Sequence, residues 1–217
     1  MEKKGNRIWK EEDRLFTENL VPGKKVYGEE LMKEKGTELR EWKAGRSKLG
    51  AAIMKGMSCN GFKNDSKVLY LGAASGTTTS HVSDICSDGM VFAVEYSHRV
   101  IPQLLKNVKK RKNVSPVLGD ARKPEEYSGI VDRVEIVFQD VAQPDQLKIF
   151  RKNCEKFLKE GGTGILAVKA RSVSSSEDPS EVFDEYGKKL EESFELVWKD
   201  SLEPYEKDHM VFMVRKN

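Results

Sequence analysis

Short apolar segments alternate with helix-like segments between residues 67 and 191, and this pattern constrains the fold most strongly. A helix between successive strands is typical of a doubly wound α/β fold, in which the strands run parallel and helices cover both faces of the sheet. The expected strands are 67–71, 90–94, 114–118, 133–139 and 163–168, and the expected helices lie near 79–86, 98–110, 145–158 and 180–191. We therefore predict a Rossmann-like parallel sheet as the framework of any site.

The two ends of the chain depart from this pattern. Residues 1 to about 45 are short mixed segments interrupted by Gly and Pro at hairpin-like intervals, which predicts a small antiparallel sheet. Residues 47–57, "SKLGAAIMKGM", place apolar side chains one helical turn apart and predict a helix that leads into the first central strand. The last two strand-like segments, "FELVWKDSLEP" and "DHMVFMVRK", have no helix between them, so we expect them to pair antiparallel.

These differences predict two parts in the chain. We expect a small β region over residues 1–50 and the α/β domain over residues 51–217. The serine-rich segment 172–180 is expected to be a mobile loop ahead of the last helix.

Composition narrows the class of protein. The 38 Lys and Arg against 35 Asp and Glu give a net charge of only +3, so attraction to nucleic acid must come from local patches. No apolar segment approaches the ~20 residues needed to span a membrane, and the N-terminus has no secretory signal. We expect a soluble, cytoplasmic protein without a membrane partner. The three cysteines, Cys59, Cys86 and Cys154, are widely spaced, so neither a disulfide framework nor a metal site is expected.

The densest basic cluster is "KNVKKRKN", residues 106–113. It lacks the interleaved aromatic side chains that stack on bases. Two interpretations stay open. The cluster is either a surface that contacts RNA or the solvated end of a helix, where the helix dipole stabilises positively charged lysines.

Polar and charged residues stand where the predicted strands end. In an open parallel sheet, ligands bind beyond the carboxyl ends of the strands, near the point where the strand order reverses. An antiparallel strand begins at the edge where its parallel neighbours end. The residues placed at this edge are Gly72, Glu95, Asp120, Asp140, Lys169 and, heading the final strand, His209.

A nearly bare turn, "GAASG", follows the first strand. Gly72 and Ala73 open this turn, and threonines that can cap a helix follow it. Glu95 lies 23 residues after Gly72, near the ~20-residue offset at which an acid accepts hydrogen bonds from a ribose diol. A nucleoside ligand is therefore expected, while the absence of GxGxxG disfavours a nicotinamide dehydrogenase. In the alternative interpretation, Glu95 and Asp120 only cap helices, and Lys169 only pairs with Asp140.

Seven segments together resemble fibrillarins of the archaeal form over nearly the whole chain. They are "GRSKLGAAIMKG", "YLGAASGTTTSHVSDI", "AVEYSHR", "GDARKPEEY", "QDVAQPDQ", "VKARSVS" and "EPYEKDHMVF". The family consists of S-adenosylmethionine-dependent RNA ribose methyltransferases. The resemblance implies the same activity on rRNA, with tRNA as a possible second substrate, and S-adenosyl-L-methionine as the cofactor.

The resemblance also implies site residues. The catalytic constellation of the family falls on Lys48, Asp140, Lys169 and His209, which adds Lys48 to the residues placed by topology. The cofactor contacts of the family fall on Thr77, Thr78, Glu95, Tyr96, Asp120, Ala121, Asp140, Val141, Ala142 and Gln143. In this scheme we expect Lys169 to accept the proton of the ribose hydroxyl, with Lys48 and Asp140 orienting that hydroxyl.

Partners follow from the resemblance as well. Archaeal fibrillarins take their sequence specificity from a box C/D guide RNA, which is held with a Nop-type scaffold protein and a kink-turn-binding protein of ribosomal type. The modest charge of this chain fits such delegation. The competing hypothesis is a module that uses the same fold to bind RNA or protein and performs no chemistry.

Overall fold

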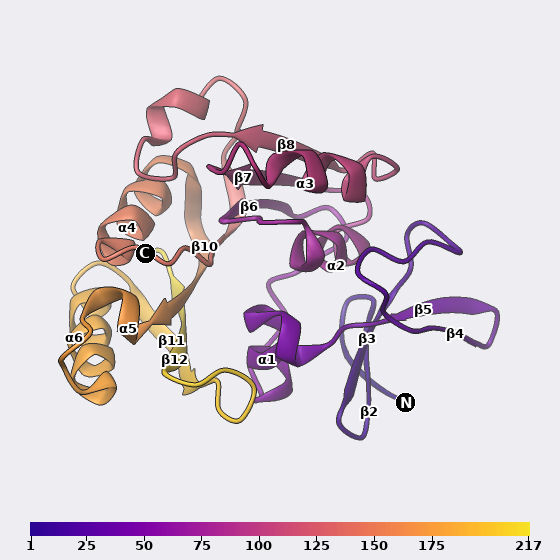
Figure 1. Ribbon diagram of the computed structural model, residues 1–217, viewed down its shortest axis with the longest axis horizontal. Coiled ribbons are helices and arrows are strands. Elements are labelled where there is room, and N and C mark those ends of the chain that lie inside the picture. The colour runs from indigo at the N-terminus through magenta and orange to yellow at the C-terminus, as the bar shows by residue number, and fades with distance from the viewer.

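The computed structural model describes all residues from 1 to 217, and the chain forms two sheets. The N-terminal sheet is antiparallel, has the strand order β1-β2-β3-β5-β4, and lies beside α1 and α2 of the larger part (Figure 1). Its strands are β1 (Glu2–Gly5), β2 (Ile8–Glu11), β3 (Arg14–Glu18), β4 (Leu31–Glu34) and β5 (Thr37–Glu41). The antiparallel sheet expected from the Gly and Pro spacing is confirmed.

The central sheet has seven strands in the order β11-β12-β10-β9-β6-β7-β8. These are β6 (Lys67–Leu71), β7 (Met90–Glu95), β8 (Val114–Leu118), β9 (Val134–Gln139), β10 (Leu158–Lys169), β11 (Glu195–Ser201) and β12 (His209–Arg215). Strands β10, β9, β6, β7 and β8 are parallel, and β12 pairs antiparallel with both β10 and β11. This is the predicted doubly wound arrangement with an antiparallel last strand.

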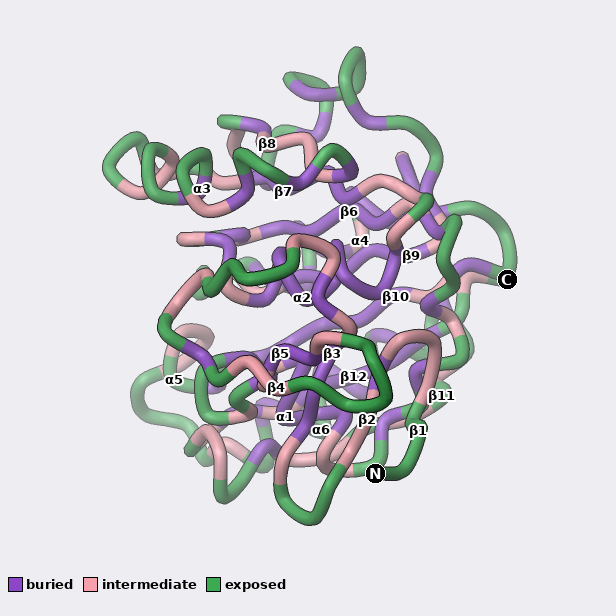
Figure 2. The backbone as a smooth tube through the Cα atoms, turned by 90° about the vertical axis from the view of Figure 1, so that its right-hand side faces the viewer, coloured by how far each residue is buried: buried purple, intermediate pink, exposed green.

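The helices cover both faces of this sheet. They are α1 (Lys48–Met54), α2 (Thr77–Ile85), α3 (Ile101–Val108), α4 (Gln146–Phe157), α5 (Ala170–Val173) and α6 (Pro179–Glu191), with short 3-10 turns η1 (Ala44–Arg46) and η2 (Pro124–Tyr127). Helices α1 to α3 pack in one core, and α4 and α6 pack in the other. The alternation along β6 assigns Val68 and Tyr70 to the first core and Leu69 and Leu71 to the second. The central strands are accordingly buried along most of their length (Figure 2).

The helix bounds bear on two expected segments, the loop over 172–180 and the boundary at residue 50. Within 172–180, α5 continues to Val173 and α6 begins at Pro179, so the irregular connection is shorter than predicted. The boundary expected between residues 50 and 51 falls inside α1, and the division into two domains stays a prediction. None of the helices combines the length and the apolar character that a membrane crossing requires.

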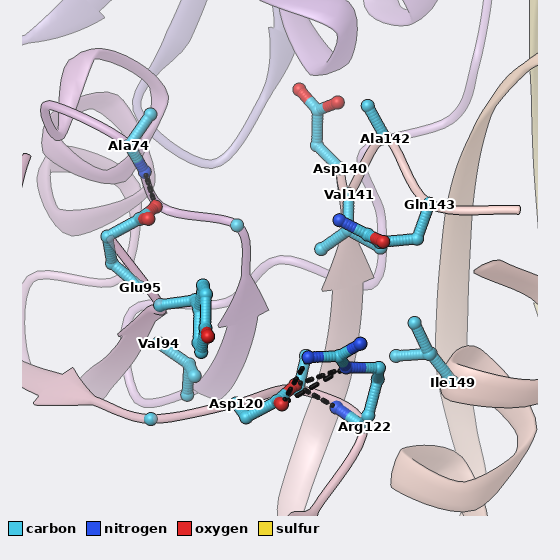
Figure 3. A pocket seen from close by; sticks show the side chains of 14 residues that line it. Ala74, Val94, Glu95, Asp120, Arg122, Asp140, Val141, Ala142, Gln143 and Ile149 are labelled. Atoms are coloured by element: carbon cyan, nitrogen blue, oxygen red, sulfur yellow. Dashed lines mark hydrogen bonds and ion pairs between the residues drawn. The ribbon is translucent and has the colours of Figure 1, made fainter. Parts of the chain in front are cut away.

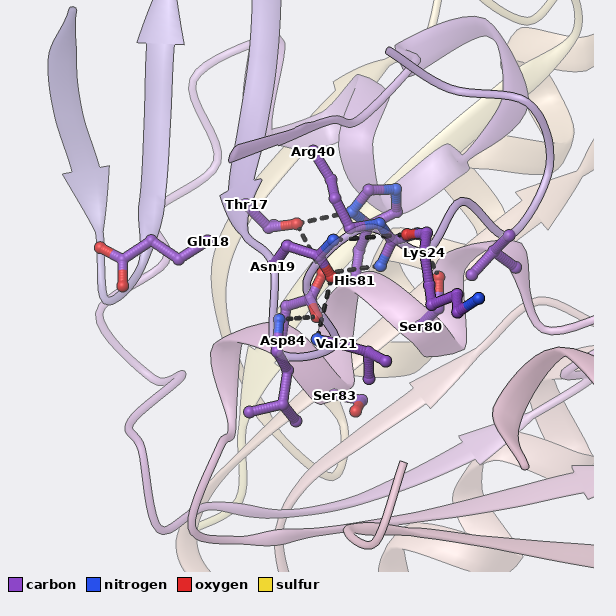
Figure 4. A network of polar contacts seen from close by, with 12 residues as sticks. Thr17, Glu18, Asn19, Val21, Lys24, Arg40, Ser80, His81, Ser83 and Asp84 are labelled. Carbon is purple, nitrogen blue, oxygen red and sulfur yellow. Dashed lines mark hydrogen bonds and ion pairs between the residues drawn. The ribbon is translucent and has the colours of Figure 1, made fainter. Parts of the chain in front are cut away.

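A buried ionic network joins the N-terminal sheet to α2 (Figure 4). Arg40 donates to Oε1 of Glu29 from Nε at 2.9 Å and from Nη2 at 2.6 Å, and to Oδ2 of Asp84 from Nη1 at 2.7 Å. The other oxygen of Asp84 accepts from Nη1 of Arg111 at 2.6 Å. The first three side chains have no exposed surface, and a buried charge persists only when it is paired. The network therefore fixes α2 against the N-terminal sheet.

His81 of α2 completes the joint in its neutral form. Burial, together with the positive charges of Arg40 and Arg111, holds the pKa of His81 well below its usual value. Its Nδ1 lies 2.8 Å from Oγ1 of Thr17, and its Nε2 lies 2.8 Å from the hydroxyl of Tyr27. The imidazole ring also stacks on the ring of Trp42. Both ring nitrogens thus contact the N-terminal part of the chain, so helix α2 is held by polar and aromatic contacts together.

Candidate functional site

Two adjacent cavities lie at the carboxyl edge of the parallel strands, where the order reverses between β6 and β9. The first has a volume of about 270 Å³ and lies among the ends of β7, β8 and β9; the second, of about 680 Å³, lies among the end of β6 and the starts of α1 and α2. The two cavities share Gly72, Ala74, Asp140 and Ala142. Each predicted cofactor residue lines at least one of them: Gly72, Ala73, Thr77, Thr78, Glu95, Tyr96, Asp120, Ala121, Asp140, Val141, Ala142 and Gln143.

The bare turn after β6 is required by a close approach of backbones. Gly72 has φ +84°, and a Cβ there would lie 2.3 Å from the carbonyl oxygen of Asp140. The N–H groups of Gly72 and Ala73 both donate to the carbonyl oxygen of Val94 at 3.0 Å. Any side chain at position 72 would therefore separate β6 from β9 and close the junction between the cavities.

Glu95 is held at the end of β7 by two backbone donors. Its Oε2 accepts from the N–H of Ala74 at 2.8 Å (Figure 3). Its Oε1 accepts from the N–H of Ser97 at 2.7 Å. A carboxylate oxygen has two lone pairs, so both oxygens keep one acceptor position. The carboxylate is thus fixed in place and able to accept from a ribose diol.

Arg122 clamps Asp120, which the sequence analysis did not foresee. Its Nε lies 3.0 Å from both Asp120 oxygens and its Nη2 lies 2.8 Å from Oδ2. These hydrogen bonds hold the pKa of Asp120 below its usual range, so the carboxylate stays ionised at neutral pH. The Arg122 guanidinium also lies 5.9 Å from the ring centroid of Tyr96, which is 64% exposed. Only the folded loop after β8 brings these groups together on one wall of the first cavity.

The capping alternative for the two acids is wrong. Val100 is the N-cap of α3, and Lys123 precedes η2. Glu95 and Asp120 therefore cap neither helix, and both line the first cavity instead.

Lys48 and Asp140 form an ion pair where the two cavities meet. The Lys48 Nζ lies 3.0 Å from Oδ1 and 3.2 Å from Oδ2 of Asp140. Ser47 caps α1 by accepting from the N–H of Gly50 at 3.1 Å, and it also accepts from Oγ1 of Thr78 at 2.9 Å. The start of α2 therefore positions the start of α1, and with it the lysine.

Lys169 and His209 face each other across β10 and β12, outside the lining of both cavities. The side chain of Lys169 is exposed and has no ion pair, whereas Lys48 pairs with Asp140. The alternative in which Lys169 only pairs with Asp140 is therefore wrong. His209 is buried, and its Nδ1 donates to the carbonyl oxygen of Lys207 at 2.7 Å. The quartet thus consists of one ion pair and one flanking pair at the same edge of the sheet.

We predict that Glu95→Ala weakens cofactor binding roughly tenfold to a hundredfold. The loss of charge-assisted hydrogen bonds to a ribose costs ~1.5–3 kcal/mol. Isothermal titration calorimetry with S-adenosylmethionine measures the change. Glu135→Ala is the matched control, because Glu135 also accepts from a backbone N–H, that of Lys67, at the opposite edge of the sheet. Equal dissociation constants for Glu95→Ala and wild type would exclude Glu95 from the cofactor site.

Comparison with known proteins identifies the family. Residues 5–217 match the family model described as fibrillarin. The "Fibrillarin-like rRNA/tRNA 2′-O-methyltransferase" of Pyrococcus horikoshii is 52% identical over 205 residues, which cover 94% of this chain and 90% of the relative. That of Thermococcus onnurineus is 53% identical over 205 residues, with 94% and 91% covered.

Solved structures agree with the sequence relatives. A chain from a fibrillarin/Nop5p complex aligns with a TM-score of 0.93 and 41% identity over the whole of both chains. The fibrillarin of Aeropyrum pernix, crystallised with natively bound S-adenosyl-L-methionine, aligns with a TM-score of 0.85 and 44% identity, covering 93% of this chain and 88% of that one. This chain belongs to the fibrillarin family.

Proposed function

We propose that this chain transfers a methyl group from S-adenosylmethionine to the ribose 2′-hydroxyl of RNA. The observation that carries the proposal is the Lys48–Asp140 ion pair, because Asp140 lines both cavities. A cofactor that extends from the first cavity past Gly72 towards Thr77 and Thr78, and a hydroxyl that enters the second cavity, would meet at this carboxylate. The activity in the names of the relatives, rRNA/tRNA 2′-O-methylation, supports the same reaction.

The residues present fit S-adenosylmethionine. Glu95 has free acceptor positions for the ribose hydroxyls, and the turn at Gly72 leaves a junction that a Cβ would fill. Thr77 and Thr78 line the second cavity at the start of α2. The first N–H groups of a helix have no partner within the helix and suit an anion such as the cofactor's carboxylate. The cofactor bound to the relative from Aeropyrum pernix supports this assignment.

The chain's own residues orient the acceptor and remove its proton. S-adenosylmethionine, when bound, supplies a methyl group that is already electrophilic because it is attached to a sulfonium. Asp140 accepts a hydrogen bond from the ribose hydroxyl and aligns its oxygen, while Lys48 holds the carboxylate in place. Lys169, at the same edge of the sheet, would accept the proton through the uncharged form of its amine. His209 keeps the end of β12 ordered through its bond to Lys207, opposite Lys169 in the neighbouring strand.

Guided methylation requires partners. We place this chain in a complex with a Nop-type scaffold, a kink-turn-binding protein of ribosomal type, a box C/D guide RNA and the target rRNA. The complex of a relative with Nop5p supports the scaffold. The net charge of +3 supports delegation of RNA recognition to the guide. Because the relatives are archaeal, whose cells have no nucleus, we also propose a cytoplasmic location.

The test is methyl transfer from tritiated S-adenosylmethionine to a guide-matched RNA, with the chain alone and in the assembled complex. We expect cofactor binding in both states and efficient transfer only in the complex, because the scaffold raises the effective concentration of RNA at the cleft. Site-specific transfer by the isolated chain would contradict the dependence on partners. Cofactor binding without transfer in the full complex would favour a non-catalytic binding module.

A further inference from the structure

Arg46 stands at the second cavity with its guanidinium unused. It lies in η1, two residues before Lys48, and both residues line this cavity. The Arg46 side chain is exposed and forms no hydrogen bond or ion pair, whereas Lys48 is engaged by Asp140 at 3.0 Å. The cavity expected to receive the acceptor ribose therefore has one cation that is free to bind a ligand.

A fixed aromatic platform holds this arginine. The Arg46 guanidinium lies 5.5 Å from the ring centroid of Tyr27. The Tyr27 hydroxyl lies 2.8 Å from Nε2 of the buried His81, and 2.9 Å from the carbonyl oxygen of Glu41. It also accepts from the N–H of Lys43 at 3.3 Å. The ring is thus anchored in the buried joint between the N-terminal sheet and α2.

The contact with Tyr27 uses none of the hydrogen-bond donors of the arginine. A cation over an aromatic ring is attracted by the π face of the ring, so the five N–H donors of the guanidinium stay available to a ligand. The planar fork of these donors matches two oxygens of a phosphate, and the contact with Tyr27 reduces the conformational freedom that the side chain loses on binding. In RNA, the phosphate on the 3′ side is attached through O3′ to C3′, and C3′ is bonded to C2′, which carries the 2′-hydroxyl. A phosphate at Arg46 therefore places that hydroxyl in the same cavity as Asp140.

Other charged groups near the site serve this purpose less well. No residue of the basic segment 106–113 lines either cavity, and Arg111 within it is buried against Asp84. Glu206, in the connection before β12, also lines the second cavity and has no ion pair. Its negative charge repels a phosphate, which confines the phosphate to the part of the cavity beside Arg46.

We propose that Arg46, held over the ring of Tyr27, binds the phosphate next to the target ribose and thereby positions its 2′-hydroxyl at Asp140. The inference rests on the proposed function and adds a contact to the acceptor strand that neither the motifs nor the names of the relatives assign. Arg46 is in this view a substrate-binding residue for any guide-selected sequence, since a phosphate contact carries no base information.

The test is the single-turnover rate of methyl transfer in the assembled complex over a series of KCl concentrations, for Arg46→Gln, Arg46→Lys and wild type. Arg46→Gln is expected to lower the rate at least about tenfold, the scale of a lost charged hydrogen bond. It should also reduce the slope of log rate against log salt by about one, because one phosphate contact is lost. Arg46→Lys should restore the slope but only part of the rate, because an ammonium lacks the planar fork.

Two controls separate the possible failures. Calorimetry with S-adenosylmethionine should give an unchanged affinity for Arg46→Gln, which shows that the fold and the cofactor site are intact. Arg215→Gln removes an exposed arginine at the far end of β12 and should change neither rate nor slope. A slower Arg46→Gln variant with the wild-type slope would overturn the phosphate contact, as would a variant that matches wild type in both readouts. Absence of transfer by the wild-type complex would overturn the proposed function itself.

Discussion

Replacing Lys48 or Lys169 with alanine is expected to lower methyl transfer at least about 100-fold, the scale of a lost acid or base group. Lys48→Ala leaves the Asp140 carboxylate without the ammonium that holds it at 3.0 Å. Lys169→Ala removes the proposed proton acceptor. Lys169→Arg should not restore the rate, since a guanidinium stays protonated. Transfer of tritiated methyl groups by the assembled complex measures each rate.

A second lysine in the same helical segment provides the matched control. Lys55, at the end of α1, lies 3.5 Å from Asp200 and lines neither cavity. Lys55→Ala should retain the wild-type rate, and all three alanine variants should bind S-adenosylmethionine with nearly wild-type affinity. A Lys169→Ala or Lys169→Arg variant with wild-type turnover would remove Lys169 from the mechanism.

Arg40→Leu is expected to lower the free energy of unfolding by about 3–5 kcal/mol, because it removes one partner from a buried ionic network. Glu29 would then lose its only ion pair, and Asp84 would keep only Arg111. Urea unfolding followed by circular dichroism measures the change. Any transition that begins in the N-terminal sheet should also disturb α2, because the network joins these two elements.

Arg14→Leu is the control for the network. Arg14 belongs to the same sheet and also pairs with two carboxylates, those of Glu30 and Glu41, but its side chain is 38% exposed. Exposed ion pairs contribute about 0–1 kcal/mol, so a small change is expected. Equal effects of Arg40→Leu and Arg14→Leu would show that the buried network adds nothing beyond an ordinary surface pair.

The sequence predicted the framework of the site because its signals are local. Apolar alternation located β6, β7 and β8 almost to the residue, and the expected parallel direction of the strands placed their ends at one edge. Glu95 and Asp120 could therefore be assigned to the same edge without any structure. Lys48 could not be assigned in this way. The spacing of apolar residues in 47–57 predicted only a helix, and the resemblance to fibrillarins was needed to include Lys48 in the site.

The remaining features depend on contacts between distant segments. The sequence places Arg111 in a basic cluster that indicates a surface, but in the fold this side chain is buried against Asp84. Nothing in the sequence around Tyr27 indicates a role, and only the folded chain places its ring below the guanidinium of Arg46. Arg40 and Asp84 are separated by 44 residues in the chain. No periodicity or motif links such residues, because their contacts exist only after the two sheets have packed together.

The central claim is tested most directly by locating the transferred methyl group. The assembled complex is incubated with S-adenosylmethionine and a guide-matched RNA, and the product is digested to nucleosides and to sequence-specific fragments for mass spectrometry. The account predicts one 2′-O-methylated ribose, at the nucleotide that the guide selects, and its absence when Asp140→Asn replaces the wild-type chain. Methylation on a base, or a 2′-O-methyl group formed equally well by the Asp140→Asn variant, would contradict it.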